Sequence, residues 1–417
     1  MLSLHTSPLA RLGRTRDAGG MNVYVRELSR ELGRGGILVD VFTRWNDPAD
    51  PPIEPLGERV RLIRIAAGPI APLPTSELFP HVAEFVRHVR RFAERAGHPY
   101  DLVHSHYWLS GVAGMTLARL WDAPHVAMFH TVERLKGERL GEAAAALTPA
   151  GERRADYEGR IAASADCVTV ATAHERDQLE RIYGLGASRF EIIPCGVDLD
   201  RFTPGTAAQR HTARTRLETE LGLRGGDPVL LAVGRLDPIK GSDLLLEAVS
   251  QMRTPANLVL VGGNPDGDPE LERLRGRAAA LGLAERVRFP GAVAQEALPR
   301  YYRAADALVV ASRYESFGLV AVEALASGTP VVASKVGGLP SIVRDGTNGL
   351  LIPWRCPGAF AEGLDALLGD PARLRRFGAA ARPSVERFGW QRIGDQVRAR
   401  YQELTSAHRC AEACCCF

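Results

Sequence analysis

Long hydrophobic runs are missing from this 417-residue chain, and cysteine is scarce outside its last residues. No stretch of roughly 18 apolar residues and no charged and then apolar leader occurs, which argues against a membrane span and a signal peptide. Four of the seven cysteines crowd the tail at 410–416, without the spaced pairs of a zinc site, and the other three are isolated. We therefore expect a cytoplasmic protein without a disulfide framework.

Charge of one sign is also lacking, since 52 Lys and Arg face 49 Asp and Glu for a net charge of +3. A protein that binds nucleic acid by neutralising phosphates over a broad face needs a larger excess, so no nucleic-acid partner is expected. One helix predicted over 82–95 does carry a basic face (Arg87, Arg90, Arg91, Arg95). A solvated face on a core helix is favoured over membrane contact, although a lipid-directed enzyme would use such a face. A homodimer is compatible with the sequence.

The length predicts two domains, because a single core rarely grows beyond about 250–300 residues. Apolar segments with strand character alternate with amphipathic segments in both halves, which predicts an α/β protein with parallel sheets. We expect a first domain at 1–200, a second domain at 201–375, and a terminal segment at 376–417 whose helix returns to the first domain. The polar stretch 196–226 is predicted as the boundary, and 48–55 as a proline-rich loop.

The stretch 312–323 follows a predicted buried strand and leads into a helix predicted from Phe317. Backbone N–H groups at the start of a helix bind anions such as a diphosphate. Glu323, inside the helix, could then reach ribose hydroxyls, and Glu315, on the loop, a neutral hydroxylated group. The alternative is that Glu315 caps the helix and Glu323 is a solvated surface acid.

A second loop favours ligand binding over the capping and surface roles of these two glutamates. Arg235 and Lys240 lie on the loop after the predicted strand Val229–Val233. A guanidinium fork and an ammonium on one loop can bind the two phosphates of a diphosphate. The two loops together predict a site for a nucleotide-sugar.

Polar residues also follow two predicted strands of the first half: His106 and Tyr107 after one, His130 and Thr131 after the next. Open parallel sheets bind ligands beyond the carboxyl ends of their strands, so these residues are candidates for ligand contact. A structural role for each histidine remains the alternative. Gly20, in the turn Asp17–Asn22 before a predicted helix, would let the backbone approach a ligand or would only form a tight turn.

Three motifs carry a resemblance to a known family: Leu4-His5-Thr6-Ser7-Pro8-Leu9, Asp17-Ala18-Gly19-Gly20-Met21-Asn22-Val23-Tyr24 and His104-Ser105-His106-Tyr107-Trp108-Leu109-Ser110-Gly111. With them, nearly the whole chain resembles the retaining glycosyltransferases of family 4. The resemblance implies the GT-B fold, two Rossmann-like domains around a central cleft. It is closest to the mycothiol-pathway enzymes, which move N-acetylglucosamine from UDP to D-inositol 3-phosphate, and to sucrose-phosphate-synthase-like enzymes.

Carried over to this sequence, the resemblance implies a role for each matching residue. On the donor side it assigns the diphosphate to Arg235 and Lys240, and the ribose hydroxyls to Glu323. It assigns the transferred sugar and the distal phosphate to Glu315 with the backbone of Ser316, Phe317, Gly318 and Leu319. The turn at Gly20 would approach the diphosphate. His130 would contact the donor sugar near the reacting centre. On the acceptor side it assigns the inositol phosphate to Asn22, Tyr107, Thr131 and Arg154.

The chain departs from these relatives at two places. Thr75, which the resemblance also places at the acceptor, stands where the relatives have a phosphate-binding lysine, and 129–136 differs after Thr131. The implied function is retaining transfer of glucose or N-acetylglucosamine from a UDP-sugar, with an acceptor like D-inositol 3-phosphate narrowly favoured. An unphosphorylated cyclitol or sugar, a lipid acceptor and a sucrose-phosphate-synthase-like reaction remain alternatives.

No metal or other cofactor is expected besides the UDP-sugar as co-substrate. The two Asp-x-Asp strings, at 198–200 and 266–268, are interpreted as loop or capping acids. A non-catalytic nucleotide-sugar sensor would need the donor loops alone, and the presence of His130 and the acceptor residues favours an enzyme. No motif suggests the lysine-bound cofactor of a phosphorylase of the same fold.

Overall fold

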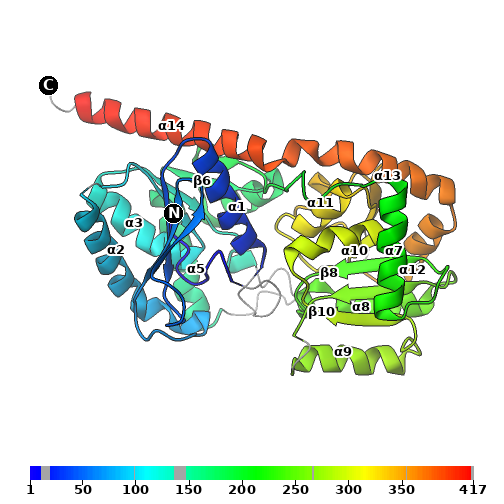
Figure 1. The fold of residues 1–417 in the computed structure, drawn as a ribbon. Helices are drawn as coiled ribbons and strands as arrows, with labels where there is room; N and C mark the ends of the chain where they lie inside the picture. The colour runs from blue at the N-terminus through cyan, green and yellow to red at the C-terminus, as the bar shows by residue number, and fades with distance from the viewer. Residues whose placement is uncertain (11–18, 98, 136–146, 265–266, 354, 415–417) are drawn as a thin grey trace. The chain divides into compact units, whose positions relative to one another are not determined.

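The computed structural model describes residues 1–10, 19–97, 99–135, 147–264, 267–353 and 355–414. Its contacts divide the described chain into two units (Figure 1). The N-terminal unit comprises Met1–Ala10, Gly20–Cys195 and the helix that begins at Trp390, and the C-terminal unit runs from Gly196 to Gly389. Each unit has its own sheet and its own core, as expected for an α/β chain of this length. The domain boundaries at residues 200 and 375, which the sequence predicted, remain a prediction.

The N-terminal unit is built on two groups of strands, joined by the first residues of the chain. The strands are β1 (Val39–Arg44), β2 (Ile53–Gly57), β3 (Val60–Ile65), β4 (Val103–His106), β5 (His125–Met128), β6 (Cys167–Val170) and β7 (Phe190–Ile192), in the orders β1-β3-β2 and β4-β5-β6-β7. Leu2 bridges Phe42 on one side and Ser105 on the other, both in parallel. The first residues of the chain therefore connect the two groups.

One strand of this unit contradicts the sequence prediction. The proline-rich stretch 48–55 was expected to be a loop, but β2 begins within it and pairs with β3 antiparallel. Only Leu56 of β2 is buried, and Pro55 removes one backbone donor. A strand with so little burial leaves no hydrophobic alternation for a sequence pattern to detect.

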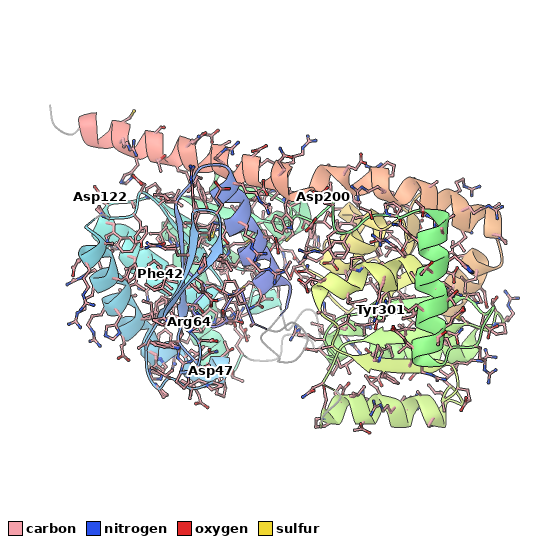
Figure 2. The ribbon with its side chains drawn as sticks, viewed as in Figure 1. Phe42, Asp47, Arg64, Asp122, Asp200 and Tyr301 are labelled. Carbon is pink, nitrogen blue, oxygen red and sulfur yellow. The ribbon has the colours of Figure 1, made fainter. Side chains whose placement is uncertain are left out.

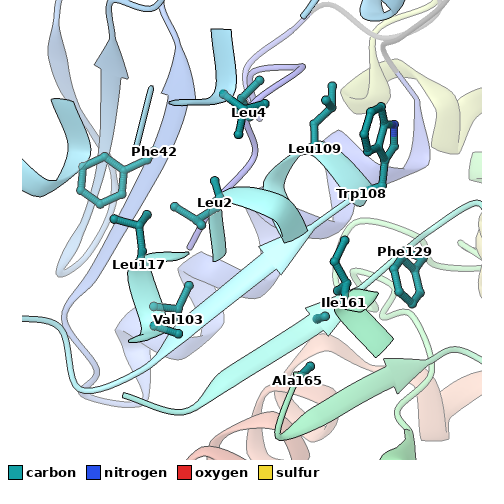
Figure 3. Close-up of a cluster of buried hydrophobic side chains, with 14 of the residues drawn as sticks. Leu2, Leu4, Phe42, Val103, Trp108, Leu109, Leu117, Phe129, Ile161 and Ala165 are labelled. Carbon is teal, nitrogen blue, oxygen red and sulfur yellow. The ribbon is translucent and has the colours of Figure 1, made fainter. Parts of the chain in front are cut away.

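Helices cover the N-terminal sheet with small and aliphatic side chains. They are α1 (Gly20–Arg34), α2 (Val82–Ala96), α3 (Trp108–Trp121), α5 (Pro149–Ser164), α6 (Ala173–Tyr183) and α14 (Trp390–Cys414). Leu109 and Leu117 of α3 and Ile161 of α5 meet Leu2 and Val103 in the core (Figure 3). Close approach of α3 to α5 depends on Gly111, where a Cβ would lie 2.6 Å from Ile161. The basic face predicted on α2 is exposed, and its opposite face is buried.

The C-terminal unit is a six-stranded parallel sheet in the order β10-β9-β8-β11-β12-β13. Its strands are β8 (Val229–Val233), β9 (Asn257–Val261), β10 (Val287–Gly291), β11 (Ala307–Val310), β12 (Val331–Ser334) and β13 (Gly349–Ile352). Its helices are α7 (Ala207–Leu221), α8 (Ser242–Gln251), α9 (Pro269–Ala280), α10 (Leu298–Ala304), α11 (Leu319–Ala326), α12 (Pro357–Leu368) and α13 (Pro371–Val385). Most strand residues are buried and aliphatic, which is why the sequence located these strands closely.

Helix α7 lies inside the stretch 196–226, which the sequence predicted as a boundary. Leu217 is its one buried residue, so the helix has no apolar stripe to recognise. The helix is fixed instead by a capping box at Thr206 and Gln209, and by Arg214, which donates to the Ala304 carbonyl and to Asp306. The contacts of Arg214 depend on partners about 90 residues away, so they leave no local pattern in the sequence.

Two glycines of the C-terminal unit provide a test of this packing. Gly262, after β9, has φ of +148° and a Cβ there would lie 1.8 Å from the Gly234 carbonyl oxygen. We expect Gly262→Ala to destabilise the protein by at least about 2 kcal/mol, because backbone must move to relieve the contact. Gly276→Ala, at an exposed position in α9 with open space around it, should instead stabilise by about 0.5–1 kcal/mol. Denaturant unfolding of the two variants measures both effects, and equal stabilities would contradict the model.

Candidate functional site

The strand order of the C-terminal unit reverses between β8 and β11, since the chain runs outward from β8 through β9 to β10 and then returns to β11. Ligands of open parallel sheets bind at such a point, beyond the carboxyl ends of the strands. The loops after β8 and β11 pack directly on each other here. Arg313 N–H donates to the Ile239 carbonyl at 2.7 Å, and a Cβ on Gly241 would lie 2.2 Å from the Ala311 carbonyl oxygen.

Charged side chains from both loops meet at this point. Lys240 Nζ donates to Glu315 Oε2 at 2.7 Å, and the Ser312 hydroxyl lies 3.4 Å from the same oxygen. Arg235 lies 3.8 Å from Asp237 and is about one third exposed (36%). The structure thus brings Lys240 and Glu315 together, as the two-loop prediction required, and it pairs each cation with a carboxylate.

Helix α11 begins at Leu319 and not at Phe317 as predicted. The reason is Gly318, whose φ of +112° is left-handed and lies outside the helical region. No side chain caps this helix, so its first N–H groups depend on other partners. The Phe317 ring is buried and meets Phe388 edge to face at 5.5 Å, so only the backbone of Phe317 is suited to contact a ligand.

Glu323 is buried inside α11, which excludes the interpretation as a solvated surface acid. Its two carboxylate oxygens accept hydrogen bonds from Tyr302 Oη at 2.7 Å and from Gln295 Nε2 at 3.3 Å. Burial raises the pKa of Glu323 to about 7, although both donors and the charge of Arg201 oppose the shift. Tyr302 and Gln295 were not predicted from the sequence, because neither lies in a motif with Glu323.

In the N-terminal unit, β4 and β5 end side by side and deliver the predicted polar residues. Tyr107 and His130, directly beyond these ends, have φ of +75° and +60°. Such values are rare for residues with a side chain and cluster at functional sites. His106 Nδ1 and His130 Nε2 are 3.1 Å apart, so one donates and the other accepts. Tyr24 packs edge to face on both imidazole rings.

The imidazoles here are neutral at physiological pH. Burial of the ring lowers the pKa of His130 to about 3, even though the residue keeps some exposure. Burial, with the charges of His130 and Arg154, lowers the pKa of His5 to about 3, and it holds the pKa of His106 well below its ordinary value. A neutral His130 can orient a hydroxyl by a hydrogen bond but supplies no positive charge.

Arg154 on α5 joins the ends of both strands. Its guanidinium donates to Tyr107 Oη at 2.9 Å, to the Thr131 carbonyl at 2.7 Å and to the Thr131 hydroxyl at 3.1 Å. It also lies 4.7 Å from the centre of the Tyr107 ring. Tyr107 and Thr131, two of the predicted acceptor residues, therefore meet at the buried guanidinium of a third, Arg154.

Two carboxylates at this guanidinium were not predicted as site residues. Glu158, fully buried, accepts from Arg154 Nε at 2.7 Å, from the Glu133 backbone N–H at 2.9 Å and from Tyr183 Oη at 3.1 Å. Glu133 Oε2 lies 3.1 Å from Arg154 Nη1. A signal for Glu158 existed, since it stands one helical turn after Arg154. Glu133 stands in the stretch 129–136, where the chain departs from its relatives, and no motif connects it to Arg154.

The other predicted acceptor residues and Gly20 lie as follows. Asn22 is buried and donates to Thr6 Oγ1 and to the Ser7 carbonyl, both at 2.7 Å, so it holds these two residues in place. Gly20 is the exposed first residue of α1. Thr75 opens a short 3-10 helix (Thr75–Glu77), and its buried hydroxyl has no hydrogen-bond partner within the described residues.

The Asp-x-Asp strings were interpreted as loop or capping acids. Asp198 accepts from the backbone N–H groups of Asp200 and Arg201, and Asp268 caps α9 through Glu270 and Leu271. Asp200 is labelled in Figure 2, and Asp266 lies outside the described residues. Across the described ranges, no group of three or more His, Cys, Asp or Glu has an arrangement that could hold a metal ion. No helix within those ranges is long and apolar enough to cross a membrane.

Known glycosyltransferase families match both parts of the chain. The model of the glycosyltransferase family 4 matches residues 18–201, and the model of group 1 glycosyl transferases matches residues 213–383. The D-inositol 3-phosphate glycosyltransferase of Xylanimonas cellulosilytica is 41% identical over 97% of this chain and 96% of its own. The enzyme of the same name from Geodermatophilus obscurus is 43% identical over 96% and 88%.

Solved structures agree as well. Sucrose-phosphate synthase from Thermosynechococcus elongatus has a TM-score of 0.88 and 36% identity, covering 97% of this chain and 98% of its own. HepE of Anabaena, solved in complex with UDP-glucose, has a TM-score of 0.74 at 22% identity, covering 94% and 98%, which shows a common fold. With two Rossmann-like units and full-length relatives above 40% identity, this chain belongs to the GT-B glycosyltransferases of group 1 and family 4, the nucleotide-sugar-dependent hexosyltransferases.

Proposed function

We propose that this protein transfers a hexosyl unit, glucose or N-acetylglucosamine, from a UDP-sugar to a hydroxyl of a cyclitol or sugar, with retention at the anomeric carbon. The observation that carries the proposal is the ion pair of Lys240 with Glu315 at the reversal of the strand order, where a diphosphate and a sugar would each find a partner. HepE carries UDP-glucose on the same fold. The reaction is proposed for the cytoplasm.

On the donor side, Arg235 and Lys240 bind the diphosphate, together with the N–H groups of Ser316, Phe317, Gly318 and Leu319 at the start of α11. Lys240 exchanges Glu315 for phosphate oxygens when the donor arrives, which leaves the Glu315 carboxylate to accept from sugar hydroxyls. Glu323 accepts from the ribose hydroxyls. Gly20 approaches the diphosphate, and neutral His130 contacts the transferred sugar.

For the chemical step, we propose displacement on the front face of the sugar. The acceptor oxygen bonds to the anomeric carbon on the side from which UDP leaves, and the departing phosphate oxygen takes the acceptor proton. Arg235, Lys240 and the α11 N–H groups stabilise the charge that develops on UDP, which is the contribution a divalent ion makes in other transferases. No carboxylate is assigned the role of a covalent nucleophile.

The acceptor is proposed to bind at Asn22, Thr75, Tyr107, Thr131 and Arg154. The names of the relatives make D-inositol 3-phosphate the first compound to test. The 36% identity to sucrose-phosphate synthase supports a hexose phosphate as the second candidate. A UDP-release screen with UDP-glucose and UDP-N-acetylglucosamine against both compounds and their unphosphorylated forms tests the proposal, and no release with any pair would contradict it.

Removing either donor cation should slow the reaction. We expect Arg235→Ala and Lys240→Ala to lower kcat/KM by about thirty- to several-hundred-fold, because each loses roughly 2–4 kcal/mol of contact with the departing diphosphate. The matched control is Arg275→Ala, which removes an exposed arginine paired with Glu272 on α9 of the same unit. Wild-type turnover in either loop variant would refute the assignment.

The buried Glu323 should oppose stability at high pH. Its pKa of about 7 lies above the ordinary value of 4.5, so the folded protein keeps a proton that the unfolded chain loses, and stability falls as the pH rises from 4.5 through 7. The difference corresponds to roughly 3 kcal/mol. We expect Glu323→Gln to melt above the wild type at pH 8 and to lose this advantage near pH 4.5.

Thermal melts with and without UDP measure this effect. UDP should stabilise the wild type more than Glu323→Gln, because ribose hydroxyls donate to the carboxylate. Glu296→Gln, an exposed change one residue from Gln295, should follow the wild type. Identical melting of wild type and Glu323→Gln at pH 8 would contradict the pKa, and an equal UDP shift would contradict the ribose contact.

Catalysis should not depend on a divalent ion. We expect millimolar EDTA to leave turnover within about twofold, since protein cations and backbone N–H groups supply the positive charge at UDP. The measurement is UDP release before and after chelation, with added Mg²⁺ and Mn²⁺ as controls. A strict requirement for Mn²⁺ would overturn the proposed donor site.

A further inference from the structure

Two arginines of the C-terminal unit lie where the loops after β8 and β11 pack on each other. Arg355, on the loop after β13, donates from Nη2 to the Ala311 carbonyl at 3.2 Å, and a Cβ on Gly241 would lie 3.2 Å from the same nitrogen. Arg313 donates its backbone N–H to the Ile239 carbonyl at 2.7 Å. Both arginines are therefore held at the same contact, one through its side chain and one through its backbone.

These two positive charges repel each other and are not neutralised by a neighbouring acid. Neither Arg313 nor Arg355 forms an ion pair with the described residues, and Glu315, two residues after Arg313, is paired with Lys240. Burial and the charge of Arg313 lower the pKa of Arg355. Trp354, which precedes Arg355 and lies outside the described residues, carries no charge. An anion at this contact would relieve the repulsion.

The guanidinium of Arg355 has donors that the fold does not use. Of its five N–H groups, only one on Nη2 has an acceptor within the described ranges, the Ala311 carbonyl. Its Nε is buried and has no hydrogen-bond partner in those ranges. Buried donors in native proteins are nearly always paired, so an unpaired one calls for an acceptor such as an ion or a water. The oxygens of an anion could accept from the unused donors.

The position of Arg355 differs from that of the proposed donor contacts. Arg355 directly precedes the N-cap of α12, and Gly241 is the N-cap of α8, and these two helices pack against each other. The chain moves along the sheet in one direction from β8 to β9 and in the opposite direction from β11 to β12, so right-handed crossovers place α8 and α11 on opposite faces. Arg313 is exposed and Arg355 is partly exposed, so a solute can reach them.

We propose that Arg313 and Arg355 form a binding site for a phosphate dianion, either inorganic phosphate or the phosphate of a small monoester, separate from the donor contacts assigned to Arg235 and Lys240. Two guanidinium groups match the nearly two negative charges of such a phosphate, and each can bind its oxygens through parallel N–H groups. The site lies outside the proposed transfer reaction, since neither arginine has a role in it.

Phosphate binding tests this site directly. The full chain is titrated with inorganic phosphate at low ionic strength and followed by phosphorus NMR, with saturating UDP to occupy the proposed donor site. We expect Arg313→Ala and Arg355→Ala each to weaken phosphate binding by at least about tenfold, because each loses charge-assisted hydrogen bonds. Binding that UDP abolishes, or that both variants retain unchanged, would overturn the proposal.

Control variants separate the site from the fold and from the donor loops. Arg313→Ala changes an exposed side chain and should melt with the wild type, so its loss of phosphate is not a loss of structure. Arg355→Lys should bind phosphate more weakly than the wild type and more tightly than Arg355→Ala, because an ammonium lacks the guanidinium fork. Arg275→Ala, on exposed α9, should bind as the wild type does. Phosphate lost in Lys240→Ala and kept in Arg313→Ala would place the anion at the donor loop and refute the site.

Methyl phosphate identifies the source of the anion. Tighter binding of this ester than of inorganic phosphate would point to a phosphorylated metabolite, and the reverse to free phosphate; in both cases the binding should depend on Arg313. These titrations need neither an acceptor nor turnover. Phosphate binding that is lost in Arg313→Ala, alongside no UDP release by the wild type with any acceptor, would refute the proposed transfer and leave the anion site supported. Transfer without phosphate binding would refute the site alone.

Discussion

Both units depend on one constraint: parallel strands bring every strand-to-helix loop to the same edge of the sheet. In the C-terminal unit this constraint places the loops after β8 and β11 side by side, although about 75 residues separate Lys240 from Glu315. In the N-terminal unit it places His106 and Tyr107 beside His130 and Thr131. The proposed chemistry lies at these two edges, above hydrophobic cores.

Buried polar groups at these edges are held by specific side-chain and backbone partners. Glu323 depends on Tyr302 and Gln295, and Arg154 depends on Tyr107, Thr131 and two carboxylates. A buried charge is costly unless it is paired, so each of these residues is fixed in one geometry before a ligand arrives. Preorganisation of this kind is what a transferase needs, because it orients two substrates without relying on mobile side chains.

Burial also determines which groups carry charge. Histidines were attractive candidates from their positions after the strands, yet burial leaves His130 and His106 neutral at physiological pH. Arg235 and Lys240, which keep contact with solvent, are instead the proposed source of positive charge for a nucleotide-sugar. The two edges therefore differ: the loops after β8 and β11 carry partly exposed cations beside carboxylates, and Arg154 is a buried cation beside Glu133 and Glu158.

The sequence by itself determined the strands and most helices of the two sheets. The predicted strand Val229–Val233 was located to the residue, because a buried strand of aliphatic residues is a local signal. It also determined the identity of the family, since motifs are contiguous, and it predicted the two loops that are proposed to bind the donor. It missed β2 and α7, which bury almost nothing and so have no periodicity to detect.

Only the tertiary structure decided which charges meet. Glu133 is 21 residues from Arg154 and Gln295 is 28 residues from Glu323, and no spacing rule connects positions on different elements. Gly318 has a left-handed conformation, which moved the start of α11, and a Cβ there would lie 2.9 Å from the Leu339 side chain. Pairing of buried charges depends on distances across the fold, and the sequence encodes those distances only through the packing of the whole unit.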